Sequence, residues 1–404
     1  MSSRISGFYS LSLEERRKVL RTAAGLSEDS ATSAALQNGA DVELLDQFVE
    51  NVIGGFSLPL GIAVNFVVDG ADVLIPMAVE ESSVVAAASN MARLVRNTGG
   101  FVTEVLEDLM IGQVQISDVP DLDAAQAAIA DRKDEIIARA NALDPRLVAV
   151  GGGCRDIELR PFSAAQTGSS NNLVVHLLVD TMDAMGANAV NTMCEALAPD
   201  LAAWAGGRPG LRILSNLADR RRYSAECRVR PSDIAVGDLS GEEVVQRIVA
   251  AAEFATWDPY RATTHNKGIM NGIDPVVIAT GNDWRAVEAG AHSFAAKGGH
   301  YGSMSRWWID SSGDLCGRLE LPMQVGILGG VTRLHPLARF SLRLMGVERA
   351  GDLARIILSV GLAQNLGALR ALATEGIQKG HMRLHRRNQE LSAGADGGDG
   401  SPTS

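Results

Sequence analysis

The sequence predicts an α+β protein of at least two domains, in which a compact segment of strands and helices is inserted into a larger, mostly helical domain. The chain has 404 residues, more than one hydrophobic core usually organises. Between about residues 108 and 219, strand-like apolar runs alternate with helical segments, whereas helical patterns dominate on either side. The composition, 46% hydrophobic and 21% charged, is typical of a globular protein with a substantial core.

Local signals predict the elements before the insertion. Ser12 and Glu15 form a capping box that begins a charged helix. The β-branched and aromatic residues of 50–76, interrupted by glycines, predict a hairpin. The alanine-rich segment from Val84 to Arg96 is expected to be helical.

Within the insertion, we expect strands at 114–116 and 173–179 and helices at 123–142 and 188–202. Beyond it, the sequence predicts a helix around 241–255, then glycine-rich loops through residue 330 with a short apolar strand at 275–279, and a long helical stretch over 337–374. Residues 392–404 are small and polar and are expected to form a disordered tail.

Charge and cysteine usage exclude several classes of protein. The net charge of −11 argues against a surface that binds nucleic acid or anionic lipid. No stretch approaches 18 uninterrupted apolar residues, and the first residues lack the apolar region of a signal peptide. The four cysteines lie far apart without metal-ligand spacing, so we expect reduced, buried thiols, no metal site and a cytoplasmic location. They are Cys154, Cys194, Cys227 and Cys316.

Four polar clusters stand out, because burying such residues is costly unless they are paired or used. They are 80–83, 264–274, 281–285 and 380–385. Taken alone, the first and third suggest helix caps, the second a surface loop, and the fourth a solvated basic helix rather than a metal-binding histidine pair. The chain has no P-loop and no G-x-G-x-x-G, H-E-x-x-H or G-x-S-x-G motif.

Together, however, these clusters belong to a pattern that resembles the second-class, bacterial-type hydroxymethylglutaryl-coenzyme A reductases. The resemblance covers roughly residues 45–390 in a single order. The matching segments are 50–54, 75–81, 152–156, 183–188, 212–219, 265–272, 281–285, 361–365 and 375–381.

The resemblance implies a catalytic set of Glu81, Lys267, Asp283 and His381. Lys267 would stabilise negative charge on the carbonyl oxygen, and Glu81 would supply or remove its proton. Asp283 would lie beside both, keeping the lysine ionised, and His381 would protonate the departing coenzyme A thiolate. Ser83, Arg261, Asn271, Gln364 and Asn365 are expected around the hydroxymethylglutaryl group, where an arginine fork can clamp a carboxylate.

The implied cofactor site is a small ferredoxin-like domain rather than a Rossmann fold. Its helix 188–202 would direct free amides at the dinucleotide phosphates. Asp144 would receive the ribose hydroxyl and repel the extra phosphate of NADP, so NAD (NADH) is expected. The cofactor contacts expected from the resemblance are Asp144, Asp183, Met185, Gly186, Asn188 and Asn216.

The resemblance also implies an organisation and an activity. The large domain would comprise 1–108 and 220–375, the NAD-binding domain 109–219, a shortened C-terminal flap 376–391 and the tail 392–404. The activity would be the reversible conversion of mevalonate and coenzyme A to HMG-CoA with two NAD, in a homodimer or higher oligomer with sites at the subunit interface. A biosynthetic NADPH enzyme and a non-catalytic binder of coenzyme A thioesters are the alternatives.

Overall fold

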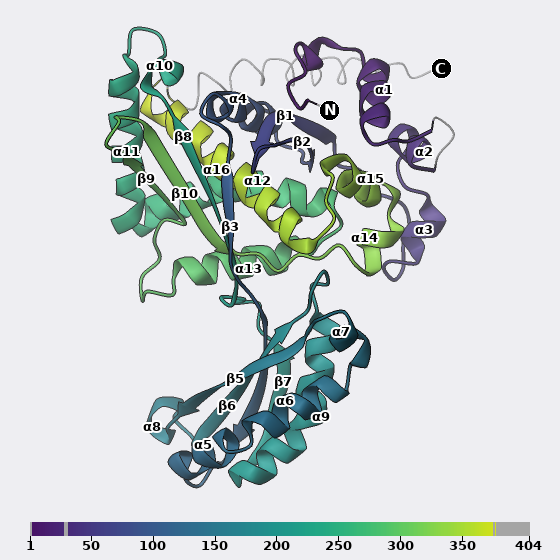
Figure 1. Cartoon of the computed structure of the whole chain (residues 1–404), viewed down its shortest axis with the longest axis vertical. Coiled ribbons are helices and arrows are strands. Elements are labelled where there is room, and N and C mark those ends of the chain that lie inside the picture. Colours follow the sequence, from purple (N-terminus) through teal and green to yellow (C-terminus); the bar gives the residue numbers. More distant parts are fainter. Residues whose placement is uncertain (1, 28–30, 375, 377–404) are drawn as a thin grey trace, which may run out of the picture.

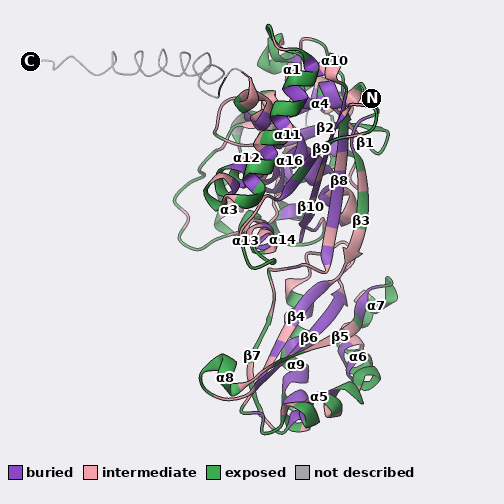
Figure 2. Cartoon of the chain, turned by 90° about the vertical axis from the view of Figure 1, so that its left-hand side faces the viewer, coloured by how far each residue is buried: buried purple, intermediate pink, exposed green. Residues whose placement is uncertain are grey.

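The computed structural model describes residues 2–27, 31–374 and 376. The chain folds into two bodies, a large domain with the N-terminal and C-terminal elements and a small domain below it in Figure 1. Extended segments on both sides of the insertion connect the two bodies, as Figure 1 and Figure 2 show. His381, nearly all of the expected flap and the expected tail lie outside the described residues.

The small domain is a four-stranded antiparallel sheet covered by helices. The sheet has the order β5-β6-β4-β7, and helices separate β4 from β5 and β6 from β7. This is the β-α-β-β-α-β arrangement of ferredoxin-like domains, so the α+β fold is confirmed. Its elements are β4 (Met110–Ser117), α5 (Leu122–Ala130), α6 (Lys133–Ala142), α7 (Pro145–Ala149), β5 (Gly153–Phe162), α8 (Ala164–Thr167), β6 (Asn172–Asp180), α9 (Ala187–Ala205) and β7 (Arg208–Leu214).

The single helix predicted over 123–142 is wrong, because α5 and α6 are separate helices. Both bury apolar residues in the same core, Ala125 and Ile129 from α5 and Ile136 and Ala140 from α6. The apolar residues therefore keep a helical spacing across the break between α5 and α6. For this reason the sequence pattern does not indicate the break.

The large domain combines a helical layer with more strand than predicted. Its sheet has the order β3-β8-β10-β9, and β1 and β2 form a separate hairpin. Its first elements are η1 (Phe8–Ser10), α1 (Leu13–Ala23), α2 (Ala31–Asn38), α3 (Val42–Asp46), β1 (Leu60–Val68), β2 (Ala71–Ala78), α4 (Val84–Arg96) and β3 (Val102–Asp108). After the small domain come β8 (Arg221–Val229), α10 (Pro231–Ile234), α11 (Gly241–Trp257), α12 (Pro259–Ala279), α13 (Trp284–Ala295), β9 (Ser305–Ile309), β10 (Leu315–Pro322), α14 (Gly330–Leu334), α15 (Pro336–Met345) and α16 (Ala350–Ala373).

The predicted capping box, hairpin and helix over 84–96 are confirmed. The predicted loop at 264–274 and strand at 275–279 are wrong, since both belong to the 21-residue helix α12. The polar residues and Pro275 of α12 interrupt the apolar periodicity by which a helix is predicted from sequence. Gly272 permits a close approach to α16, because a Cβ there would lie 2.8 Å from both the Gln364 Cβ and the Val360 carbonyl oxygen.

The helical stretch predicted over 337–374 is interrupted. α15 ends at Met345, its C-cap Gly346 has the left-handed conformation (φ 67°) that favours glycine, and α16 begins at Ala350. By length and composition α16 could cross a membrane, but 67% of its apolar window is buried within the structure. It is therefore the central core helix of the large domain, in contact with α12, α4 and β8.

The four cysteines are free and buried, as expected. Cys154 and Cys194 lie in the small-domain core, and Cys227 and Cys316 on neighbouring strands of the large-domain sheet. Burial raises the pKa of the Cys154 thiol to about 11 and that of Cys194 to about 12, so these two side chains are protonated packing groups.

Candidate active site

One cavity, of about 360 Å³, lies between α12, α16 and the start of α4. Residues of α12 reach it because helical spacing puts Arg261, Thr264, Gly268 and Asn271 on one face. The expected residues that line it are Glu81, Ser83, Arg261, Lys267, Asn271, Gln364 and Asn365. The structure thus brings together all five expected substrate residues and two of the expected catalytic residues.

Glu81 and Lys267 form an ion pair at the wall of this cavity. The Lys267 Nζ atom lies 3.2 Å from Glu81 Oε2, although the two residues are 186 positions apart in the chain. Both side chains remain partly exposed, 63% for Lys267 and 38% for Glu81. They are therefore accessible to a bound molecule, which suits groups that must exchange a proton with it.

Arg261 is the candidate carboxylate clamp. Burial lowers the pKa of its guanidinium, and among the residues that the structure describes no carboxylate pairs with it. A partly buried guanidinium without a protein counter-ion favours an anionic ligand. Ser83, at the N-cap of α4, adopts a left-handed conformation (φ 77°) and makes no capping bond with its side chain.

The buried wall of the cavity contains a hydrogen-bond network with a defined orientation. The Trp307 indole N–H can only donate, so the Asn365 amide oxygen must face it, at 2.7 Å. The Asn365 amide nitrogen then faces His265 Nε2 at 3.2 Å, and Ser305 Oγ lies 2.7 Å from the same ring nitrogen. Ser305 Oγ also donates to Asn365 Oδ1 at 2.8 Å, so the three side chains form one network, whereas His265 Nδ1 has no partner among the described residues.

Burial lowers the pKa of His265 to about 3, so this ring is neutral at physiological pH. Sequence reasoning missed His265 as a wall residue, although it begins one of the matching segments. Both ends of the Asn365 amide are bonded within the protein, so its contact with substrate stays a prediction. The Gln364 Oε1 atom, by contrast, has no partner among the described residues.

Asp283 does not join Glu81 and Lys267 within one chain. It is the N-cap of α13, as its position suggested, and it accepts from the backbone amides of Arg285 and Ala286 at 3.0 and 3.2 Å. Lys267 and the end of α12 at Ala279 are separated by twelve residues, or about 18 Å of helix. Asp283 therefore lies beyond the C-terminal end of α12, whereas Lys267 lies in the middle of that helix.

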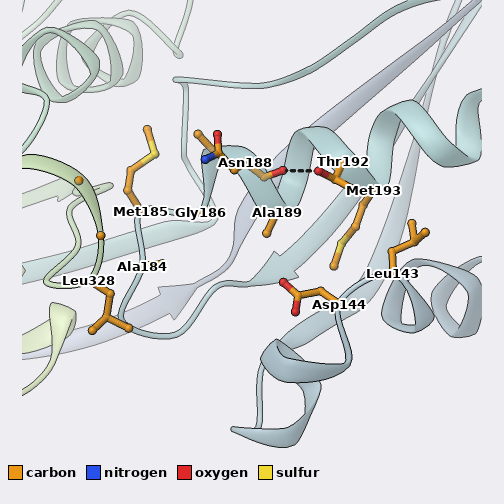
Figure 3. Close-up of a pocket in the computed structure, with 13 residues that line it drawn as sticks. Leu143, Asp144, Ala184, Met185, Gly186, Asn188, Ala189, Thr192, Met193 and Leu328 are labelled. Carbon is orange, nitrogen blue, oxygen red and sulfur yellow. Dashed lines mark hydrogen bonds between the residues drawn. The ribbon is translucent and has the colours of Figure 1, made fainter. Parts of the chain in front are cut away.

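A second cavity, of about 560 Å³, lies between the small domain and a loop of the large domain (Figure 3). The expected residues that line it are Asp144, Met185, Gly186 and Asn188. Leu328, Gly329 and Gly330 of the large domain also line the cavity. Gly186 is the N-cap of α9 and no side chain caps this helix, so its first amides are available to an anion.

Asp144 has two structural roles. Its carboxylate caps α7 by accepting from the Leu147 amide at 3.0 Å, and the residue also lines the cavity. The other two expected cofactor residues do not line it. Asp183 Oδ1 accepts from the Ala350 amide at 2.8 Å, and the Asn216 carbonyl accepts from Gln324 at 3.0 Å.

The family model for hydroxymethylglutaryl-coenzyme A reductase matches residues 12–386. A 3-hydroxy-3-methylglutaryl-coenzyme A reductase of Archaeoglobus fulgidus is 54% identical over 98% of this chain and 89% of its own length. A probable enzyme of the same name from Borreliella burgdorferi is 36% identical, covering 86% of this chain and 78% of the relative.

Solved structures agree with these sequence matches. The class II 3-hydroxy-3-methylglutaryl-CoA reductase of Streptococcus pneumoniae, bound to NADPH in open conformations, superposes with a TM-score of 0.86 at 42% identity. The match covers 91% of this chain and 99% of that one. A further structure of the Streptococcus pneumoniae enzyme gives a TM-score of 0.87 at 43% identity, over 96% and 92% of the two chains.

Proposed function

The chain belongs to the hydroxymethylglutaryl-coenzyme A reductase family and is a reductase of class II, and from this premise we propose that it uses NAD at active sites shared between two subunits. The observation that carries this proposal is the ion pair of Glu81 and Lys267 in a cavity that also contains Arg261 and Asn271. Mevalonate or HMG-CoA would bind in this cavity, with its carboxylate on Arg261.

The chemistry assigned to this pair follows from the charge that develops on the substrate oxygen. A bound nicotinamide would supply or accept the hydride. The Lys267 ammonium would stabilise negative charge on the carbonyl oxygen of the thioester or aldehyde, and Glu81 would exchange a proton with the same oxygen. The 3.2 Å separation of the two groups allows both to reach one atom. His381, outside the described residues, is proposed to protonate the thiolate of coenzyme A.

Asp283 would complete this set from a second subunit. The twelve residues of α12 that follow Lys267 span about 18 Å before the chain turns towards Asp283, so we infer that the two groups of one chain do not act on one oxygen. Asp283 lies on the side of the large domain that faces the second cavity, because the neighbouring Asn282 accepts from the Gly326 amide at 2.8 Å. In a dimer, the second cavity and Asp283 of one subunit would face the Glu81–Lys267 cavity of the other. A cofactor bound to the first subunit would then reach the substrate bound to the second.

Exposed apolar side chains support such an assembly. Between α3 and β1, Val49, Ile53 and Phe56 are exposed by 60%, 103% and 94%. Apolar groups concentrated in this way favour a protein interface over water. The four free, buried cysteines support a reducing, cytoplasmic location.

An absorbance assay tests the proposed activity. Mevalonate, coenzyme A and NAD are expected to yield NADH, and the rate with NADP should be lower. No NADH above background, together with retained binding of coenzyme A thioesters, would instead support the non-catalytic binder. Faster turnover with NADP would favour the NADPH-dependent alternative. The Streptococcus pneumoniae enzyme, whose structure contains NADPH, is a precedent for that alternative.

Asp144 is proposed to set the preference for NAD. Asp144→Asn is expected to raise the NADP to NAD ratio of kcat/KM by about tenfold, because removing the carboxylate would relieve roughly 1.4 kcal/mol of repulsion of the extra phosphate of NADP. Asparagine is also a good N-cap, so α7 should keep its stability. Asp144→Ala is the matched variant that loses both charge and cap. An unchanged ratio in both variants would refute the role of Asp144.

A further inference from the structure

Residues 181–186 form the loop that enters the second cavity, and this loop is held by an unusual buried arginine. The Arg221 side chain is only 1% exposed and lies at the start of β8, where the chain re-enters the large domain. Its Nη1 atom donates to Thr181 Oγ1 at 3.1 Å and to the Ala184 carbonyl at 3.0 Å, and its Nη2 atom to the Met182 carbonyl at 3.3 Å.

The charge of Arg221 is balanced at the other domain crossing. Its Nε atom lies 2.9 Å from Asp108 Oδ1, at the end of β3. The guanidinium of Arg221 thus links the loop to both strands next to the domain crossings, β3 and β8. The planar fork of arginine suits this arrangement, since lysine lacks the fixed set of divergent donors.

A second contact fixes the same loop. Asp183 Oδ1 accepts from the Ala350 amide, the first residue of α16, at 2.8 Å, and the Asp183 carbonyl accepts from Ile327 at 2.9 Å. Gly326 packs beneath the loop, where a Cβ would lie 2.5 Å from the Met185 nitrogen. Asp183, expected from the resemblance to contact the cofactor, is bonded to the large domain and does not line the second cavity, so that contact stays a prediction.

We propose that Arg221, with Asp183 as a second anchor, is a positioning residue of the dinucleotide site. It acts through Ala184, Met185 and Gly186, which line the second cavity and lead into the uncapped N-terminus of α9. Holding this loop directs the first amides of α9 into the cavity before the ligand arrives, so little ordering remains to be done on binding. The inference rests on the proposal that this cavity binds the dinucleotide.

The experiment compares Arg221→Lys with Arg222→Lys in the full-length enzyme. Arg222 is the adjacent residue of β8, but its guanidinium pairs with Glu320 at 2.6 Å and not with the loop. Arg221→Lys is expected to raise the dissociation constant of NADH, measured by fluorescence, and the KM for NAD by at least about tenfold. The KM for mevalonate should stay within about twofold, because its cavity shares no lining residue with the second cavity. Arg222→Lys should change neither.

Each other outcome has a defined meaning. If Arg221→Lys lowers thermal stability but leaves NADH affinity unchanged, or shifts both KM values equally, Arg221 is a structural residue only and the inference is wrong. If that variant does not fold, Asp183→Asn decides by the same split between the two KM values. A wild-type enzyme that neither binds NADH nor oxidises mevalonate would refute the proposed function itself, which separates the two failures.

Discussion

Lys267→Met is expected to lower kcat by about 10²- to 10³-fold, because it removes the fixed positive charge proposed to stabilise the developing oxyanion. The side chain is 63% exposed, so its ion pair with Glu81 contributes no more than about 1 kcal/mol to folding. The variant should therefore fold normally. Steady-state kinetics of mevalonate oxidation and a thermal unfolding curve measure the two effects separately.

Lys297→Met is the matched control for this variant. Lys297 is also an exposed lysine, 57% accessible, and it is also paired with one carboxylate, that of Asp219 at 2.5 Å. It lines neither cavity, so its removal should leave kcat unchanged. Equal activity of the Lys267→Met and wild-type enzymes would contradict the assigned role of Lys267.

Mixing two inactive variants is expected to restore activity if the active site is shared. Lys267→Met and Asp283→Asn should each be nearly inactive, and asparagine should still cap α13. When the subunits are exchanged, each mixed dimer has one site with wild-type Lys267 from one subunit and wild-type Asp283 from the other. A random mixture of equal amounts should thus recover about a quarter of the wild-type activity.

The same experiment can contradict the shared site. If each site were built within one chain, every site of a mixed dimer would contain one substitution, and mixing would restore nothing. The control is Lys267→Met mixed with itself through the same exchange protocol. Light scattering shows whether the chain forms the required dimer, and a monomer that retains full activity would exclude the arrangement.

Local sequence signals predicted those elements whose formation depends on near neighbours. Ser12 and Glu15 predicted the start of α1, and the residues before Pro76 predicted the hairpin. The same signals failed for α12, where glycine, proline and polar residues lie in a helix that packs closely on α16 through Gly272. There, tertiary contacts outweigh the weak intrinsic preferences of the residues.

By itself, the sequence determined the family, the α+β class and the identity of the candidate residues, because these depend on residue types in a fixed order. Only the tertiary structure decided which of them meet. It joined Glu81 to Lys267 from distant parts of the chain, and it bonded Asp183 to the Ala350 amide, whereas Asp144 lines the second cavity. It also placed Asp283 at the N-cap of α13, beyond the twelve residues of α12 that follow Lys267, because a rigid helix fixes the spacing of the residues along it.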